Sequence, residues 1–186
     1  MVEAVISFAF AGIFLAAAGG FFLQSISRHA QMSAWSSMLS VSEIIFDQIG
    51  GEIRGAKYSG YGENGLQIVS EGSSRCPAVI LTDRQGRRVE ITRTKEEGHP
   101  YLLFWYYPTK EEPEGNLWTF DPKLYQGCVI DQLEFTLLTG QESYPENVIQ
   151  ITLTLRHEKT GFQYTRNRCV PCGPFYSTFP ILFNGQ

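Results

Sequence analysis

The sequence predicts an α+β fold in which a long N-terminal helix packs by its second half on an antiparallel β-sheet. Three observations support this prediction. Residues 4–23 form an uncharged apolar run, and apolar residues then recur at three- and four-residue steps as far as residue 56. After residue 66, several segments alternate apolar and polar residues one by one.

The distribution of charge divides the chain in the same way. The 186 residues include 15 Lys and Arg and 19 Asp and Glu, for a formal charge of −4, but residues 1–42 hold only Glu3 and Arg28. An apolar content of 43% excludes wholesale disorder, and the mild acidity argues against a nucleic-acid partner. We therefore expect three regions: a hydrophobic transmembrane helix over 1–24, an amphipathic helical extension over 25–56, and a β-rich globular domain over 57–186.

The run over residues 4–23 (AVISFAFAGIFLAAAGGFFL) is long enough to cross a membrane. At about 1.5 Å per residue, a helix of this length spans roughly 30 Å, the thickness of a bilayer core. A cleaved signal peptide is the main alternative, because residues 16–18 (AAA) provide a cleavage site before Gly19. However, no Lys or Arg precedes the run, and Glu3 stands where a basic residue is expected. We therefore favour a helix that crosses the membrane once.

Glu3 is a carboxylate at the edge of this apolar helix, where burial without a partner is costly. Two interpretations are open. The carboxylate can interact favourably with the N-terminal end of the helix dipole at the level of the lipid headgroups. Alternatively, it can form an ion pair with an α-amino group, either its own or that of a neighbouring subunit.

Helical periodicity continues beyond the apolar run. One apolar stripe consists of Trp35, Met38, Leu39, Ile45, Phe46, Ile49, Ile53 and Ala56. Residues 1–76 contain no Pro, and a helix over residues 2–56 would be about 80 Å long. Gly50-Gly51 is a weak point, since Gly costs about 1 kcal/mol relative to Ala in a helix interior. We expect the helix to end at Gly55 and the Gly-rich stretch 58–62, and we interpret the stripe as core packing.

The rest of the chain indicates antiparallel strands. Strand-like segments occupy residues 78–82, 87–93, 101–107, 132–137, 149–156 and 162–170. Asp83-Arg84-Gln85-Gly86 predicts a hairpin between the first two, and the alternation in the later segments predicts a sheet with one buried face, which the apolar stripe of the helix would cover. Residues 108–115 are expected to form a charged loop. The apolar tail over 175–183 would be either a last strand or a docking surface.

The cysteines are Cys76, Cys128, Cys169 and Cys172. In a domain outside the cytoplasm they predict two disulfides, for which three pairings exist, and we favour Cys76 with Cys128 and Cys169 with Cys172. The last two also form a CxxC motif, but Pro171 opposes the helix that a thioredoxin-like redox centre needs. A four-cysteine zinc site usually has two CxxC pairs, and only one is present here.

No motif for catalysis or cofactor binding stands out. The sequence has no Walker A loop, GxSxG or HExxH motif, and its three histidines, His29, His99 and His157, are scattered. The acidic residues in 111–114 are interpreted as a solvated loop rather than a calcium site. We therefore expect no enzymatic activity, no cofactor and no metal.

The order of these parts resembles that of type IV pilin-like proteins. The resemblance is carried by Met1-Val2-Glu3-Ala4-Val5 and the apolar run that follows, since family members have a hydrophobic pair, a glutamate and then a long apolar helix. Residues 42–56 are similar to the helix end of the larger minor pilins and pseudopilins, and 130–137 and 148–155 resemble their sheet strands. Family precursors carry a short basic leader before this motif, whereas Met1 here stands two residues before the glutamate.

This resemblance implies a pilin-like fold and a non-catalytic subunit of a type IV pilus, a competence pilus or a type II secretion filament. Glu3 would be the assembly residue, pairing with the N-terminal amine of a neighbouring subunit. The implied partners are other pilin or pseudopilin subunits, the inner-membrane assembly machinery and membrane lipid. The chain would cross the cell membrane once, with residues 57–186 outside the cytoplasm, at the pilus or cell surface.

Two alternatives to this function are kept. The first is a single-pass, membrane-anchored surface binding module that does not polymerise. The second is a secreted enzyme whose first eighteen residues are removed, although no catalytic constellation supports it.

Overall fold

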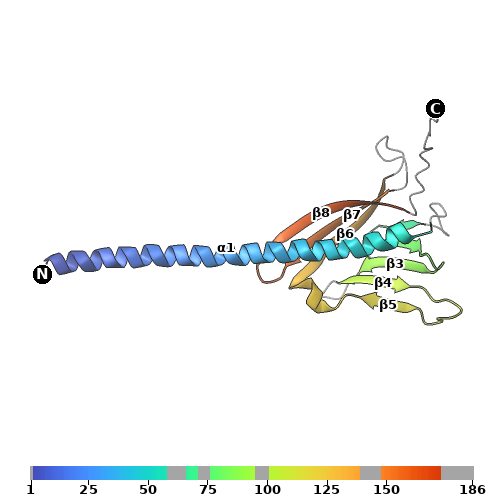
Figure 1. Cartoon of the computed structure of the whole chain (residues 1–186), viewed down its shortest axis with the longest axis horizontal. Helices are drawn as coiled ribbons and strands as arrows, with labels where there is room; N and C mark the ends of the chain where they lie inside the picture. Colours follow the sequence, from blue (N-terminus) through green and yellow to red (C-terminus); the bar gives the residue numbers. More distant parts are fainter. Residues whose placement is uncertain (1, 58–65, 71–75, 95–100, 139–147, 173–186) are drawn as a thin grey trace, which may run out of the picture.

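The computed structural model describes residues 2–57, 66–70, 76–94, 101–138 and 148–172. In these residues a long helix, α1 (Val2–Gly55), is followed by eight strands and a short 3₁₀ helix. Figure 1 shows α1 extending far beyond the strands, so that its N-terminal half stands alone and its C-terminal half lies across the β-rich part. The predicted α+β class is therefore confirmed. The stretch 58–62 and the apolar tail over 175–183 lie outside the described residues.

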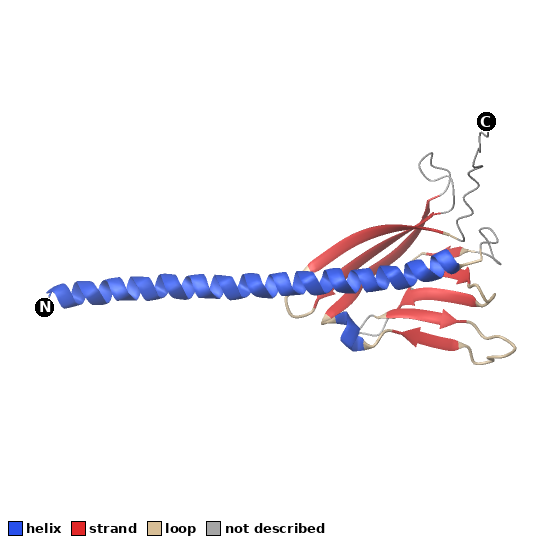
Figure 2. Cartoon of the chain, in the orientation of Figure 1, coloured by secondary structure: helices blue, strands red, loops and turns tan. Residues whose placement is uncertain are grey.

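The described strands form two antiparallel sheets, one with the order β1-β2-β3-β4-β5 and one with the order β6-β7-β8 (Figure 2). The first contains β1 (Gln67–Val69), β2 (Ala78–Thr82), β3 (Arg88–Arg93), β4 (Leu102–Tyr106) and β5 (Asn116–Thr119). The second contains β6 (Cys128–Leu138), β7 (Val148–His157) and β8 (Gln163–Pro171), and the 3₁₀ helix η1 (Pro122–Tyr125) connects the two sheets. The sequence predicted one sheet, because alternation shows which side chains share a face but not which strands pair.

The hairpin predicted at residues 83–86 is confirmed. β2 and β3 pair antiparallel, with Thr82 opposite Arg88. Gly86 has a φ of 85°, which glycine adopts without the steric cost that a Cβ atom brings. The predicted charged loop over 108–115 joins β4 to β5.

The core lies between the C-terminal half of α1 and the sheets. Five large α1 side chains are at most 1% exposed: Met38, Ile45, Phe46, Ile49 and Ile53. The helix contacts β6, β7 and β8, and on β7 the alternating Ile149, Ile151, Leu153 and Leu155 are buried as predicted. Trp35 departs from the predicted stripe. It is 48% exposed and packs edge-on against Tyr164, with ring centroids 4.8 Å apart, while Ala34 is buried in its place.

The two glycines predicted to weaken α1 do not interrupt it. The helix continues for 54 residues. Ile49 and Ile53, on either side of the pair, are fully buried, and burial of two such side chains offsets a helix propensity cost of about 1 kcal/mol per glycine. A Cβ atom at Gly50 would lie 3.6 Å from Val170 Cγ2, so the helix backbone lies close to β8 here.

An ion-pair cluster joins the docked half of α1 to β8. Arg166 donates to Glu43, and the Arg168 guanidinium lies 2.8 Å from an Asp47 oxygen and 3.7 Å from a Glu43 oxygen. Both guanidinium groups lie over the Phe46 ring, 5.8 and 5.9 Å from its centroid. The two acids are four residues apart on the helix, a rise of about 6 Å, and the two arginines are two residues apart on the strand, a rise of about 6.7 Å. The spacing of the acids therefore matches the spacing of the arginines. The cluster therefore fixes the register of α1 along β8.

We expect Phe46→Ala to lower the free energy of unfolding of the domain by about 3–5 kcal/mol, because the substitution leaves a cavity under both arginines. The measurement is guanidinium chloride unfolding of the full chain in detergent micelles, followed by tryptophan fluorescence. Phe14→Ala is the matched control, since Phe14 lies on the same helix but is 74% exposed. Equal midpoints for the two variants would contradict the described docking of α1.

Candidate functional site: the exposed apolar half of α1

The first half of α1 makes no contact that buries it within the described chain. Every described side chain from Val2 to Ser33 is exposed, and burial begins at Ala34. The exposed large apolar side chains include Val2, Ile6, Phe8, Phe10, Ile13, Phe14, Leu15, Phe21, Phe22, Leu23 and Ile26. A continuous apolar surface of this extent requires a cover other than water.

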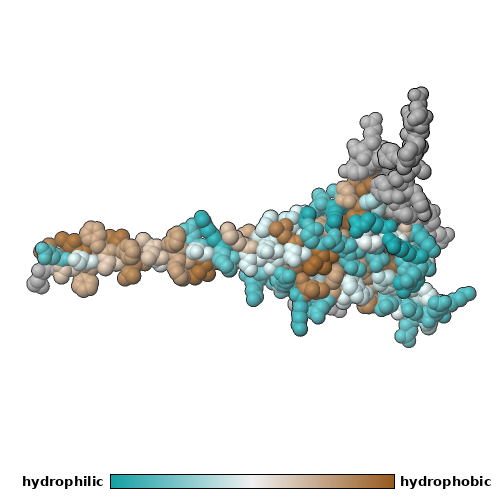
Figure 3. Space-filling view, in the orientation of Figure 1, coloured by the Kyte–Doolittle hydropathy of each residue, from teal (hydrophilic) through white to brown (hydrophobic). Residues whose placement is uncertain are grey.

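This surface is apolar on all sides rather than along one face. Figure 3 shows hydrophobic residues along the outer part of the helix, followed by a short hydrophilic band and then the mixed surface of the domain. In the sequence, the apolar run is followed by the mostly polar residues 24–31 (QSISRHAQ), which include Arg28 and His29. By length and composition, α1 is able to cross a bilayer. An all-round apolar helix suits either lipid or a surrounding layer of other apolar helices.

Glu3 lies in the first turn of α1 and is exposed. This position is favourable for a carboxylate, because the N-terminal end of a helix carries a partial positive charge. Within the described residues, no cation forms an ion pair with Glu3. Met1 lies outside these residues, so pairing with an α-amino group stays a prediction.

The predicted division of the chain into three regions, with boundaries after residues 24 and 56, stays a prediction. α1 passes through residue 24 without a break and ends at Gly55, after which Lys57 N donates to Thr82 O at 2.8 Å. This bond ties the end of the helix to β2. The exposed and docked halves of α1 therefore belong to one continuous helix.

The four cysteines lie on different parts of the β-rich region. Cys76 and Cys128 are buried, Cys169 is exposed on β8, and Cys172 is half-buried just after it. Cys128 lies opposite His157 at one end of the second sheet, whereas Cys169 lies opposite Gln150 toward the other end. All four are free thiols in this structure, and the predicted pairing stays a prediction.

The favoured Cys169–Cys172 bond would require a change at the end of β8. In an extended strand, residues three apart have Cα atoms about 10 Å apart, and a disulfide needs about 4.4–6.8 Å. β8 continues to Pro171, so closing this bond would require the strand to bend there. In the described part of the chain, no three His, Cys, Asp or Glu side chains are grouped closely enough to hold a metal ion.

Sequence reasoning missed a polar pocket at the end of α1. Its residues come from the last helical turns, the β2–β3 turn and β4. The signal that was available is the pair Gly51 and Gly55, one helical turn apart, together with Glu52 between them. Nothing in the sequence indicates that the β2–β3 turn faces these glycines.

No protein-family model, no curated protein and no solved structure matches this chain. Function is therefore inferred from the residues and contacts of the chain itself.

We expect Phe14→Arg to reduce insertion of the chain into membranes. Phe14 lies near the middle of the apolar run, where an arginine costs about 3 kcal/mol, equivalent to a loss on the order of 100-fold in the insertion equilibrium. The measurement is the fraction of full-length protein that resists alkaline carbonate extraction. Phe162→Arg, at a half-exposed position between β7 and β8, is the control and should insert as the parent chain does. Equal extraction of the two variants would contradict a membrane-inserted α1.

We expect the Cys128 thiol to react slowly with iodoacetamide in the reduced, folded chain. Burial, with a smaller contribution from Glu158, raises the pKa of Cys128 from 9.0 to about 11. At pH 8 the thiolate fraction is then about 100-fold below that of a thiol with the ordinary pKa, and it rises about tenfold per pH unit until the pKa is reached. Peptide mass mapping checks this result at each site.

The same mapping without reductant tests the disulfides. A Cys76–Cys128 bond would protect both residues from alkylation at every pH at which the chain is folded. Reduction would make both residues reactive together. Full alkylation of both without reductant would contradict that pairing.

Proposed function

We propose that this chain is a non-catalytic minor pilin or pseudopilin, a subunit that assembles through α1 into a type IV pilus-like or type II secretion filament. The observation that carries the proposal is the exposed half of α1. It is apolar on every side, and it continues without a break into the half on which the β-rich domain is built.

An assembling subunit encounters two environments in turn. It waits in the lipid bilayer, and it then moves into a filament in which its helix is surrounded by the helices of other subunits. Polar side chains would be costly in both places, and residues 4–23 contain only Ser7 as a hydroxyl and no charge. A helix that is apolar all round is compatible with both environments.

Glu3 supports the filament over a simple anchor. In a membrane anchor the carboxylate interacts only with the N-terminal end of the helix dipole, whereas a subunit interface can also use the charge to set the axial position of one helix against the next. By resemblance, its partner is the N-terminal amine of a neighbouring subunit. The other proposed partners are the inner-membrane assembly machinery and membrane lipid, with the β-rich domain outside the cytoplasm.

The alternative is a single-pass, membrane-anchored binding module that does not polymerise. It is favoured by the length of the apolar run, which matches one bilayer crossing and is followed by the mostly polar residues 24–31. In this case the sequence of the anchor would be interchangeable.

We expect Glu3→Ala to leave the chain in the membrane and remove it from filaments. Loss of one partner of a buried ion pair costs about 3–5 kcal/mol, so the incorporated fraction should fall by about 100-fold or more. The measurement is immunoblotting of sheared filaments and of membranes from the cells that encode the chain. Glu114→Ala, on the charged loop between β4 and β5, is the control and should assemble normally.

The anchor alternative is tested in the same cells. Replacement of residues 4–23 by an unrelated transmembrane segment should abolish incorporation if the helix assembles. If the replaced chain and Glu3→Ala both behave like the parent chain, the filament proposal is wrong and the anchor interpretation stands.

A further inference from the structure

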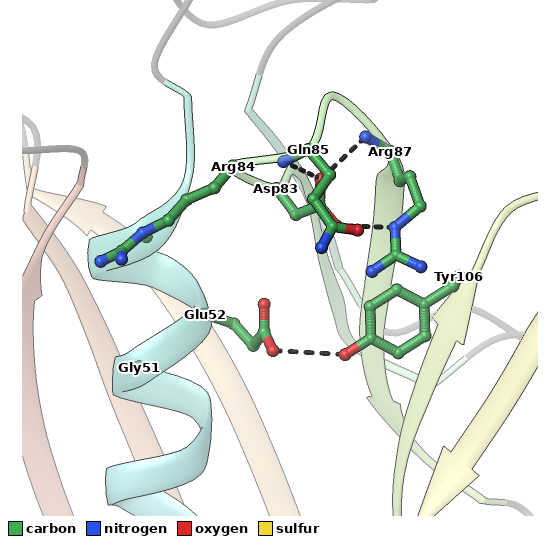
Figure 4. Close-up of a pocket in the computed structure, with 8 residues that line it drawn as sticks. Gly51, Glu52, Asp83, Arg84, Gln85, Arg87 and Tyr106 are labelled. Carbon is green, nitrogen blue, oxygen red and sulfur yellow. Dashed lines mark hydrogen bonds and ion pairs between the residues drawn. The ribbon is translucent and has the colours of Figure 1, made fainter.

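A polar pocket with a volume of about 250 Å³ lies where the end of α1 faces the β2–β3 turn (Figure 4). Its lining residues are Gly51, Glu52, Gly55, Asp83, Arg84, Gln85, Arg87 and Tyr106. They come from three elements that are distant in sequence: the last turns of α1, the hairpin turn and β4. The pocket lies at the end of α1 opposite to the exposed apolar half and is separate from it.

Two glycines line the helical wall of the pocket. Gly51 leaves its part of the wall open, whereas the Arg84 side chain lies against Gly55, where a Cβ atom would be 3.1 Å from Arg84 Nε. Gly51 and Gly55 are one helical turn apart, and both line the cavity. A Cβ atom at Gly51 would meet nothing within 4 Å, so packing does not require glycine there. Glycine in a helix interior costs about 1 kcal/mol relative to alanine. What it provides at Gly51 is open space beside the helix backbone.

A chain of contacts holds the opposite wall in place. Asp83 is only 6% exposed, and its carboxylate accepts hydrogen bonds from the Gln85 and Arg87 backbone N–H groups at 2.8 Å and from Arg87 Nε at 2.9 Å. The Arg87 guanidinium lies 4.9 Å from the centroid of the Tyr106 ring. The Tyr106 hydroxyl in turn donates to Glu52 Oε1 at 3.2 Å. Figure 4 shows the Glu52 carboxylate and the Arg87 guanidinium on opposite sides of the same space.

Tyr106 remains a donor at neutral pH. Burial, reinforced by the charge of Glu52 and the hydrogen bond to it, raises the pKa of Tyr106 to about 12. The hydroxyl therefore keeps its proton, and one oxygen of Glu52 stays occupied by it.

Several polar groups in the pocket retain bonding capacity. No described residue hydrogen-bonds to the second Glu52 oxygen or to the side chains of Gln85 and Arg84. Arg87 uses Nε on Asp83, while its NH1 has only Glu112 at 3.9 Å. A ligand here meets one carboxylate acceptor together with guanidinium and amide donors.

The charges of the lining residues cancel, which decides the class of ligand. Two carboxylates, Glu52 and Asp83, balance two guanidinium groups, Arg84 and Arg87. An anion would approach Asp83 and Glu112, which already neutralise Arg87, and would also face the partial negative charge at the C-terminal end of α1. A cation would meet the Arg84 guanidinium, with which no acid of the described residues forms an ion pair. A neutral molecule carrying both donors and acceptors avoids both repulsions.

We propose that this pocket binds a neutral, hydroxyl-rich ligand, a single sugar unit of a glycan. Neighbouring hydroxyl groups donate to the free Glu52 oxygen and accept from Arg87 and Gln85, so one diol satisfies both walls at once. The volume of about 250 Å³ lies below the roughly 300–1,000 Å³ of sites for drug-sized molecules, which limits the ligand to one ring. This inference does not depend on the proposed filament function.

The test uses the full chain, labelled with ¹⁵N, in a detergent that has no sugar headgroup. The probes are the methyl glycosides of glucose, galactose, mannose and N-acetylglucosamine, added separately. We expect at least one of them to give saturable shifts of the Gly51, Gly55 and Gln85 amide signals, with a dissociation constant on the order of 1 mM, equivalent to about −4 kcal/mol. Sodium acetate and methylammonium chloride should bind at least tenfold more weakly.

Two variants make the test specific. Gly51→Leu places a side chain in the cavity without a clash at Cβ and should abolish the shifts, whereas Ser36→Leu adds the same side chain at an exposed position of α1 and should not. Glu52→Gln keeps an acceptor for Tyr106 and should weaken binding by about tenfold, through loss of a charged acceptor.

Three results would overturn the proposal. No saturable shift with any of the four glycosides would exclude a sugar site. Tighter binding of acetate or methylammonium would mean that charge selects the ligand. Unchanged glycoside binding in both Gly51→Leu and Glu52→Gln would place the binding elsewhere on the chain.

Discussion

The unbroken backbone hydrogen bonding of α1 is the constraint on which the rest of the structure depends. A backbone N–H or C=O group that loses its partner in an apolar medium costs several kcal/mol, and the exposed half of α1 has no neighbouring element in the described chain to supply one. Only a continuous helix satisfies these groups internally. The absence of Pro over residues 1–76 is consistent with this requirement.

The docked half of α1 is stabilised by different means. There the helix covers the strands with fully buried side chains such as Phe46 and Ile49, and the arginines of β8 lie over Phe46 while pairing with acids of the helix. Each exposed ion pair contributes little to stability alone. Together, however, the ion pairs set the axial position of α1 against β8, which the hydrophobic contact does not determine by itself. Gly50 and Gly51 are tolerated because this packing holds the turn in which they lie.

The sequence was sufficient for the parts of the fold that depend on local pattern. The extent of α1, the hairpin at residues 83–86 and the alternating burial of β7 all follow from spacing and turn residues. The division of the strands into two sheets did not follow, because pairing depends on contacts between distant segments. The exposure of Trp35 escaped prediction for a similar reason, since it depends on where the domain begins to cover the helix. The polar pocket needed three elements distant in sequence to meet, so it could not be predicted from the periodicity of the sequence.

The matched spacing of the ion pairs along α1 and β8 has a mechanical consequence. Glu43 and Asp47 meet Arg166 and Arg168 in the same order along both elements, so the helix and the strand run side by side in one direction at this contact. A pull along the helix axis would then load these bonds in shear, all together, rather than peel them open one after another. A domain held in this way resists tension along the helix better than tension across it, and residues 43–47 are where such a load would pass from the helix into the sheet.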